Sequence, residues 1–243
     1  MGERDAGQLY SVARLSLGPA VRFMWRIHLV DIDHVPKSGG AILAPNHISF
    51  LDSAFLLLRL PRRITFVGKA EYLDDWKTKY LFPAIGMIPV RRGGGGAANA
   101  ALDAATRVIE RGELFGIFPE GTRSRSGDLY KGHTGMARLA LATGAPIIPV
   151  GIIGTEHIQP PGASLPRPFL PATIRFGRPI DPARYRERAD DRMVLRQLTD
   201  EVMFEVRAMT GQRYVDHYAT RTPDAIPPEL APVGRTPRLV AVG

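Results

Sequence analysis

The sequence contains no cysteine among its 243 residues. This absence excludes a disulfide framework, a thiolate metal site and a cysteine nucleophile, so a covalent mechanism would need another nucleophile. Long apolar runs are also missing. The longest are Ala54–Leu58 and the proline-broken stretch Ala145–Ile153, far short of the ~20 residues that span a bilayer. We therefore predict no transmembrane helix.

Acidic residues are the minority charge. The chain has 24 Asp and Glu against 32 Lys and Arg, which gives a formal net charge of +8 and a pI near 10.1. Such a balance favours polyanionic partners: nucleic acid, an anionic membrane surface or phosphorylated small molecules. The chain start lacks a secretory hydrophobic region, and Ala6 stands where a myristoylation signal carries Ser or Thr. We expect a cytoplasmic protein.

Residues 8–27 carry apolar side chains at roughly helical spacing, with arginines between them. The Gly18-Pro19 step predicts a break into two short helices. A basic amphipathic segment with Trp and Phe can lie in a membrane interface, and its apolar face can equally pack on the protein core. Both interpretations stay open from this segment alone.

From residue 40 onward, strand-like apolar runs alternate with segments of helical pattern, which predicts an α/β sheet covered by helices. The runs are "AILAP", "RITFVG", "GMIPV", "LFGIFP", "APIIPVGIIG" and "ATIRFG". The clearest predicted helices are 97–111, 133–143 and 191–209. Gly112 and Gly144 are expected to end the first two, and Asp190-Asp191 to cap the third.

Three parts are predicted along the chain. Residues 1–30 form an N-terminal amphipathic membrane-docking segment, residues 31–219 an α/β domain, and residues 220–243 a proline-rich tail with little regular structure.

The stretch "NHISFLDS" at 46–53 holds a histidine and an aspartate. Asp52-Ser53 is expected to cap the following helix, which places His47 where a strand's carboxyl end meets a helix, a common ligand position in α/β sheets. Asp52 could then fix the tautomer of His47. The alternative is a surface histidine beside a helix cap. Two such side chains are too few for a metal site, and Ser49 lacks a nucleophile elbow.

A second polar stretch, "FPEGTRS" at 118–124, also follows an apolar strand. Gly121 lets the backbone approach a ligand, and Thr122 and Ser124 offer hydroxyl groups. Arg123 offers a fork of donors suited to phosphate. Alone, this stretch could be a turn with a solvated arginine. Further cations that end or follow strand-like runs are Lys69, Arg91, Arg92 and Lys131, and each alone could be a surface charge.

In this order, the motifs resemble those of the glycerophospholipid acyltransferase family, whose best-known members acylate lysophosphatidic acid. The resemblance covers residues 35 to 180. Its four motifs are Asn-His-x-Ser-x-x-Asp at 46–52, Gly-x-Ile-x-x-x-Arg at 86–92, Phe-Pro-Glu-Gly-Thr-Arg-Ser at 118–124, and "APIIPVGI" with Pro149. Arg91 departs from the pattern, because relatives often carry an acidic residue there. This leaves open which of Arg91 and Arg92 contacts phosphate.

The resemblance implies a single mixed sheet covered by helices, and an O-acyltransferase in which His47 is the general base and Asp52 its orienting partner. The donor would be acyl-CoA or acyl carrier protein, with no cofactor and no metal. The acceptor would be 1-acyl-glycerol 3-phosphate. The implied substrate-binding residues are Asn46, Ser49, Lys69, Arg91, Arg92, Glu120, Gly121, Thr122, Arg123, Ser124 and Lys131. Glu120 is expected to orient Arg123 or a glycerol hydroxyl, because a carboxylate repels phosphate.

Substrate and product of that reaction are membrane amphiphiles, so we expect a peripheral protein on the cytoplasmic face of an anionic membrane. The acyl chain could run along Phe50, Leu51, Phe55 and Leu56, which could equally be helix core. Acyl transfer to glycerol 3-phosphate, another lysophospholipid, an amino acid or a glycolipid stays open. We expect no nucleic-acid partner, since no basic-aromatic stripe is present. A catalytically silent scaffold is disfavoured by the presence of both His47 and Asp52.

Overall fold

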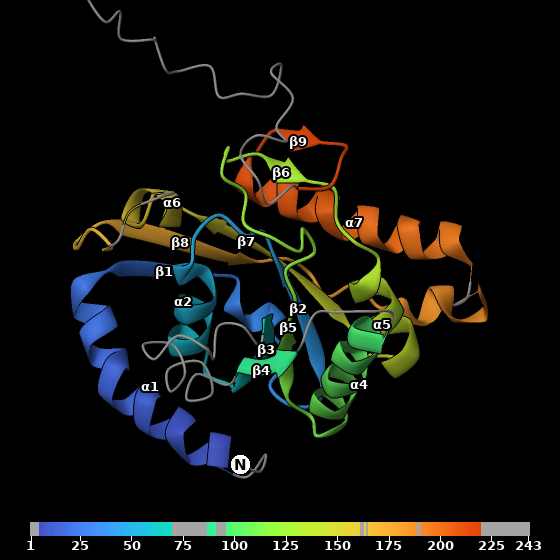
Figure 1. The fold of residues 1–243 in the computed structure, drawn as a ribbon, viewed down its shortest axis with the longest axis horizontal. Helices are drawn as coiled ribbons and strands as arrows, with labels where there is room; N and C mark the ends of the chain where they lie inside the picture. Colours follow the sequence, from blue (N-terminus) through green and yellow to red (C-terminus); the bar gives the residue numbers. More distant parts are fainter. Residues whose placement is uncertain are drawn as a thin grey trace, which may run out of the picture.

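The computed structural model describes residues 5–69, 87–90, 96–160, 163, 165–188 and 191–219. In this part of the chain, seven strands form one mixed sheet in the order β1-β8-β7-β2-β5-β3-β4 (Figure 1). Their bounds are β1 Arg26–Val30, β2 Ala41–Pro45, β3 Ile64–Lys69, β4 Met87–Val90, β5 Leu114–Gly116, β7 Ile147–Ile153 and β8 Pro171–Phe176. Neighbours from β7 to β4 are parallel, whereas β8 runs antiparallel to β7 and parallel to β1. The predicted α/β fold with a mixed sheet is confirmed.

The six apolar runs of the sequence all become strands of this sheet. The strand β1 was not anticipated, although Arg26, Ile27, His28 and Leu29 alternate polar and apolar side chains with the period of a strand. Residues 26–30 therefore belong to the sheet, even though they lie within the range 1–30 predicted to dock on membrane.

Helices cover both faces of the sheet. Their bounds are α1 Asp5–Met24, α2 Leu51–Arg59, α4 Gly96–Glu110, α5 Gly135–Thr143, α6 Thr155–Ile158 and α7 Arg192–Thr210, with 3₁₀ turns η1 Ile32–His34 and η3 Pro182–Arg188. The helices α1 and α2 pack on one face, and α4, α5 and α7 on the other, each over its own buried apolar cluster (Figure 1). Gly144 ends α5 in the left-handed conformation, as predicted. The side chain of Asp191 caps α7 by accepting a bond from the Met193 N–H.

The N-terminal segment differs from expectation in one respect: α1 is a single helix that continues through Pro19. A proline removes one backbone donor, but contacts on both sides of it hold the helix. Tyr10 is buried and its hydroxyl donates to the Leu57 carbonyl oxygen, 3.3 Å away. Past the end of α1, Trp25 is buried and its indole N–H donates to the Arg167 carbonyl oxygen, 2.7 Å away. None of the helices within the described residues is both long and apolar enough to cross a bilayer.

A small second sheet lies beside the main one. It pairs β6, Leu129–Tyr130, with β9, Tyr214–Val215, in parallel. It therefore ties the chain that follows α7 to the loop that follows β5 (Figure 1). The proline-rich tail predicted at 220–243 lies outside the described residues.

Candidate active site

The first candidate residues lie at the carboxyl end of β2, near the middle of the sheet. Pro45 ends the strand and Leu51 begins α2, so His47 lies in the short connection between them. Three neighbouring parallel strands, β7, β2 and β5, end along this edge. The stretch that follows each of them contributes to the site. This arrangement is typical of ligand sites in open α/β sheets.

Asp52 is fully buried in the first turn of α2. Its Oδ2 accepts bonds from the backbone N–H of Ile48, 2.8 Å away, from that of Ser49, also 2.8 Å away, and from His47 Nδ1 at 2.9 Å. The predicted Asp52-Ser53 cap is wrong, because Phe50 is the N-cap residue of α2. The carboxylate instead organises the connection that precedes the helix, and it holds the imidazole there.

Thr155 is a partner of Asp52 that the sequence did not reveal. Its buried Oγ1 donates to Asp52 Oδ1 at 2.6 Å. Thr155 begins α6 just after β7, and β7 pairs with β2, so the two side chains meet across 103 residues of sequence. Both oxygens of the buried Asp52 side chain therefore accept hydrogen bonds from the protein. A hydroxyl just past an apolar run could have been suspected, but only the strand order shows which carboxylate it contacts.

The imidazole of His47 is held on two sides. Since Asp52 only accepts hydrogen bonds when ionised, the hydrogen-bond network assigns the proton of a neutral His47 to Nδ1. One ring face stacks on Phe118, with centroids 3.8 Å apart and planes 19° apart. Phe118 stacks in turn on Phe66. Nε2 has no hydrogen-bond partner among the described residues, and the side chain keeps 17% exposure. The geometry is that of a histidine whose Nε2 can take up a proton.

Glu120 also holds His47, but through the backbone. Its buried carboxylate accepts the His47 N–H on Oε1 and the Tyr130 N–H on Oε2, each at 2.9 Å. The Ser124 N–H donates to the His47 carbonyl oxygen at 2.7 Å. This placement differs from the expectation that Glu120 orients Arg123 or a glycerol hydroxyl. Because both oxygens already face N–H donors, Glu120 fixes the backbone that carries the histidine.

Replacing Glu120 with glutamine is expected to flatten the pH dependence of stability. Burial raises the pKa of Glu120 from 4.5 to about 8, against the opposing effect of its two N–H bonds. An unfolded chain releases this proton near pH 4.5, whereas the folded chain keeps it until about pH 8. The free energy of unfolding should therefore fall as the pH rises through that window. Urea unfolding of both proteins across this range measures the difference between the two slopes.

The slope of the unfolding free energy against pH is compared, and not its value at one pH, because E120Q should also lower the stability at every pH. A glutamine side chain has one acceptor and one donor, so its amide N–H₂ would face either the His47 or the Tyr130 N–H. Such a mismatch costs about 1–3 kcal/mol at every pH. Parallel slopes for the wild-type protein and the variant would contradict a raised pKa at Glu120.

Asn46 is buried and fully engaged within the protein. Its side chain exchanges two hydrogen bonds with the Ile152 backbone, at 2.9 and 2.7 Å, and Nδ2 also donates to Gln212 Oε1. It thus extends the pairing of β2 with β7 by one step. Each of these bonds is to the protein, and the role of Asn46 in binding substrate stays a prediction.

The two serines of the motifs also have structural partners. Ser49 Oγ accepts the Leu51 N–H at 3.3 Å, and Ser124 Oγ accepts the Gly127 N–H at 3.1 Å. Both residues are buried. No hydrogen bond joins Ser49 to His47 in the described part of the chain, so the geometry does not support a serine nucleophile activated by this histidine.

The predicted cations differ in their surroundings. Arg123 is exposed and has no carboxylate partner within the described residues. Lys131 forms an ion pair with Asp216 at 2.8 Å, which leaves it less suited to bind phosphate. Arg91 and Arg92 lie outside the described residues, as does the side chain of Lys69, whose backbone is in β3.

The loop that carries Arg123 is sharply turned. Gly121 has φ of 72°, a left-handed conformation that suits glycine, and its N–H donates to the Phe118 carbonyl oxygen. Thr122 is half-buried beside it. Of the apolar residues suggested for the acyl chain, Phe55 and Leu56 are buried in the core, whereas Phe50 and Leu51 are only partly buried. The core interpretation therefore holds for Phe55 and Leu56.

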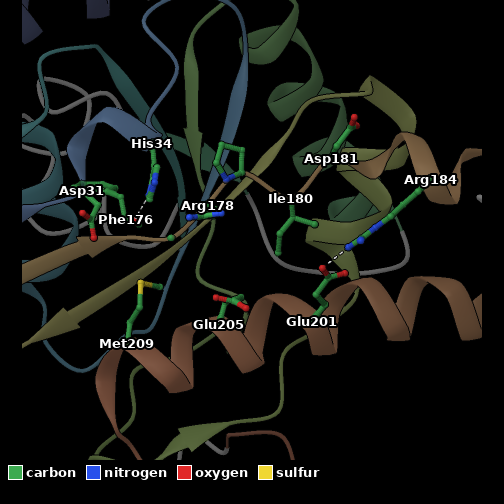
Figure 2. A pocket seen from close by; sticks show the side chains of 12 residues that line it. Asp31, His34, Phe176, Arg178, Ile180, Asp181, Arg184, Glu201, Glu205 and Met209 are labelled. Carbon is green, nitrogen blue, oxygen red and sulfur yellow. Dashed lines mark hydrogen bonds and ion pairs between the residues drawn. The ribbon is translucent and has the colours of Figure 1, made fainter.

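A separate cavity of about 680 Å³ lies between the end of β8 and α7 (Figure 2). Acidic and basic side chains line it together, and Figure 2 shows Arg184 directed at Glu201, with which it forms an ion pair. Because β8 is antiparallel to β7, the carboxyl end of β8 lies at the opposite end of the strands from His47. This cavity is not part of the His47 site. No group of three or more side chains suited to hold a metal occurs within the described ranges.

A carboxylate-held histidine at the strand ends of an α/β sheet defines a site for acid–base chemistry, and comparisons with known proteins specify the family. A family model described as Acyltransferase matches residues 26–153, more than half of the chain. The chain belongs to the acyltransferase family.

Proteins of similar sequence include named acyltransferases. The 1-acyl-sn-glycerol-3-phosphate acyltransferase of Borreliella burgdorferi is 30% identical over 132 residues, covering 54% of this chain and 53% of that protein. A chloroplastic enzyme of the same name from Arabidopsis thaliana is 27% identical over 153 residues, covering 63% and 43%. The chain thus spans about half the length of these curated relatives.

A solved structure supports the fold. The crystal structure of the 1-acyl-sn-glycerophosphate (LPA) acyltransferase PlsC from Thermotoga maritima superposes with a TM-score of 0.65 and 22% sequence identity. The match covers 86% of this chain and 82% of that one. A mixed sheet with flanking helices is therefore the shared architecture.

Proposed function

We propose that this protein transfers a fatty acyl group from an acyl thioester, acyl-CoA or acyl carrier protein, to the free hydroxyl of 1-acyl-glycerol 3-phosphate, giving phosphatidic acid. The observation that carries the proposal is the geometry of His47, whose Nδ1 is tied to buried Asp52 while Nε2 has no partner among the described residues. The family and the names of the relatives supply the reaction class.

The proposed reaction uses His47 as its base. His47 Nε2 takes the proton of the acceptor hydroxyl as its oxygen attacks the thioester carbonyl carbon. The negative charge of Asp52, 2.9 Å from Nδ1, stabilises the imidazolium that forms. When the tetrahedral intermediate collapses, the new C–O bond is kept, the C–S bond breaks, and the imidazolium returns the proton to the thiolate leaving group. No acyl-enzyme forms, which suits a chain without cysteine.

The acceptor phosphate would be bound by arginine. Arg123 is exposed on the same loop as Glu120 and has no competing carboxylate in the described part of the chain. A guanidinium can bind phosphate through two parallel hydrogen bonds. Arg92, with Arg91 beside it, is the second proposed cation by its motif position. No metal or cofactor enters the proposed reaction.

Replacing Arg123 with glutamine is expected to raise the KM for the acceptor by about 10- to 100-fold, because a charge-assisted hydrogen bond contributes about 1.5–3 kcal/mol. The KM for the thioester should change little. Steady-state kinetics with each substrate varied in turn measures both values. Arg138→Gln is the matched control, since Arg138 is an exposed arginine on α5. An equal rise in both variants would contradict a specific phosphate contact at Arg123.

The function itself is tested with an acceptor panel. The purified full chain is incubated with palmitoyl-CoA or oleoyl-CoA, or with the same acyl groups on acyl carrier protein. The acceptors are 1-acyl-glycerol 3-phosphate, glycerol 3-phosphate, other lysophospholipids, and amino-acid and glycolipid acceptors. The proposal expects the highest kcat/KM with 1-acyl-glycerol 3-phosphate. Failure to acylate any phosphate-bearing glycerol would overturn it, and a preference for another acceptor would replace its substrate.

A further inference from the structure

Helix α1 carries apolar residues on two opposite faces. Tyr10 and Val21 pack toward the core. On the opposite side, Val12, Leu15 and Phe23 point outward with exposures of 62%, 80% and 81%. Their spacing places them along one stripe of the helix. Packing on the core accounts for the inner face alone, whereas the outer stripe stays exposed.

A second segment, distant in sequence, joins this stripe. The Phe169 N–H donates to the Met24 carbonyl oxygen, and Trp25 Nε1–H donates to the Arg167 carbonyl oxygen, each at 2.7 Å. The rings of Phe23 and Phe169 meet edge to face, with centroids 6.3 Å apart. The loop before β8 is thus fastened to the end of α1, and it extends the apolar surface of the helix.

Phe169 adopts an unusual backbone conformation. Its φ is 63°, a left-handed value that disfavours bulky side chains. Its side chain is 59% exposed, so core packing does not explain the conformation. The strained backbone instead directs an aromatic ring outward beside Phe23. Leu165, in the same loop, is 80% exposed as well.

The charged side chains described on α1 and on the loop before β8 are all basic. Arg22, Arg26 and Arg167 are exposed, and none forms an ion pair with a described carboxylate. Exposed aromatic side chains surrounded by unpaired cations complement an anionic lipid surface, where the rings lie at the headgroup level and the cations face phosphate. A second protein chain would need acidic groups opposite these arginines, and a second copy of this chain would place arginines against arginines.

The position of this surface relates it to the active site. The loop that carries Phe169 leads into the amino end of β8, and β8 is antiparallel to β7. The amino end of β8 therefore lies at the same edge of the sheet as the carboxyl ends of β7 and β2, which carry Thr155 and His47. In Figure 1, α6 lies by this end of β8. A lipid surface at this edge would bring membrane-resident substrates toward the base.

We propose that a docking patch binds the protein to anionic lipid, and that its two contacts are the outer stripe of α1 and the internal loop before β8. The patch comprises Val12, Leu15, Arg22, Phe23, Arg26, Leu165, Arg167 and Phe169. Its assignment to lipid rests in part on the proposed function, but its binding does not require catalysis. The patch therefore includes an internal segment of the chain as well as the N-terminal helix.

The test is co-sedimentation of the full chain with vesicles of phosphatidylcholine, with and without phosphatidylglycerol. Phe23→Ala and Phe169→Gly should each lower the partition coefficient on anionic vesicles by about tenfold or more, because each removes the burial of one aromatic side chain. Glycine suits the positive φ at position 169, so F169G should fold at least as well as the wild-type protein. Phe204→Ala is the matched control, since Phe204 is 64% exposed but lies on α7.

Wild-type binding by F169G would remove the internal loop from the patch, and wild-type binding by both variants would overturn the proposal. Equal binding to neutral and anionic vesicles would overturn the role of the arginines. Loss of a dimer rather than of vesicle binding, seen by light scattering, would assign the patch to a second copy of the chain. Vesicle binding that persists in a protein that acylates no acceptor would retain the patch and reject the proposed function.

Discussion

Replacing His47 with alanine is expected to lower kcat for acyl transfer by about 10²–10⁴-fold, the usual contribution of a positioned general base. The fold should survive, because the imidazole contacts few groups: Asp52 through Nδ1 and Phe118 through its ring face. The side chain is also partly exposed, so its loss leaves no closed cavity. Single-turnover rates measured with saturating acceptor and thioester give the change directly.

His47→Gln is the matched variant for this test. A glutamine amide can donate to Asp52 in place of Nδ1, but it cannot take up a proton at neutral pH. Both variants should therefore lose activity to a similar extent while their unfolding transitions stay near that of the wild-type protein. Near-normal acyl transfer by a folded H47A protein would show that His47 is not the base.

Replacing Asp52 with asparagine is expected to lower kcat by about 10²-fold, since a unit charge at this separation contributes roughly a few kcal/mol at the effective dielectric of a protein site. Asp52 Oδ2 accepts bonds from the Ile48 and Ser49 N–H groups as well as from His47. Those two backbone donors will hold the asparagine oxygen in the same place, so the tautomer of His47 should not change. The variant thus removes the charge and keeps the geometry.

Thr155→Val provides the comparison for D52N. It deletes the hydroxyl that donates to Asp52 Oδ1 and leaves the carboxylate charged. We expect a loss of only a few-fold in kcat, because the charge beside His47 stays and the lost bond is to Oδ1, the oxygen that does not contact the imidazole. In D52N the same hydroxyl can rotate and accept from the new amide, which preserves packing. A wild-type rate in D52N would mean that Asp52 only positions the histidine, and a T155V loss as large as that of D52N would mean that orientation outweighs charge.

The strands were predictable because a buried parallel sheet requires continuous apolar runs, and six such runs become six strands. The glycine that ends α5 was predictable for an equally local reason, the left-handed conformation at its C-cap. The strand β1 was missed because its alternating pattern is short and follows a helix. The break expected at Pro19 does not occur, because the hydrogen bonds of Tyr10 with Leu57 and of Trp25 with Arg167, together with their burial, outweigh the local cost.

At the site, residue types were predictable from motifs, but the direction of each side chain was not. His47 and Asp52 form a hydrogen bond as expected, because they are only five residues apart across a short turn. Glu120 was expected to orient Arg123 or a glycerol hydroxyl, but its side chain accepts hydrogen bonds from two backbone N–H groups. Thr155 depends on the lateral order of β7 and β2, which a single sequence does not encode in any short stretch.

The strand order separates two parts of the proposed site. The proposed base His47, its partner Asp52 and the groups that hold them follow β7, β2 and β5, at the centre of the sheet. Of the proposed acceptor cations, Arg123 lies in the stretch that follows β5, whereas Arg91 and Arg92 follow β4, an edge strand of the described sheet. Sequence changes in the two parts are therefore expected to have different effects. Under the proposed function, changes to the loop after β4 could alter which headgroup is accepted without displacing His47. Changes to the stretch after β5 would affect both Arg123 and the Glu120 side chain that holds the His47 backbone.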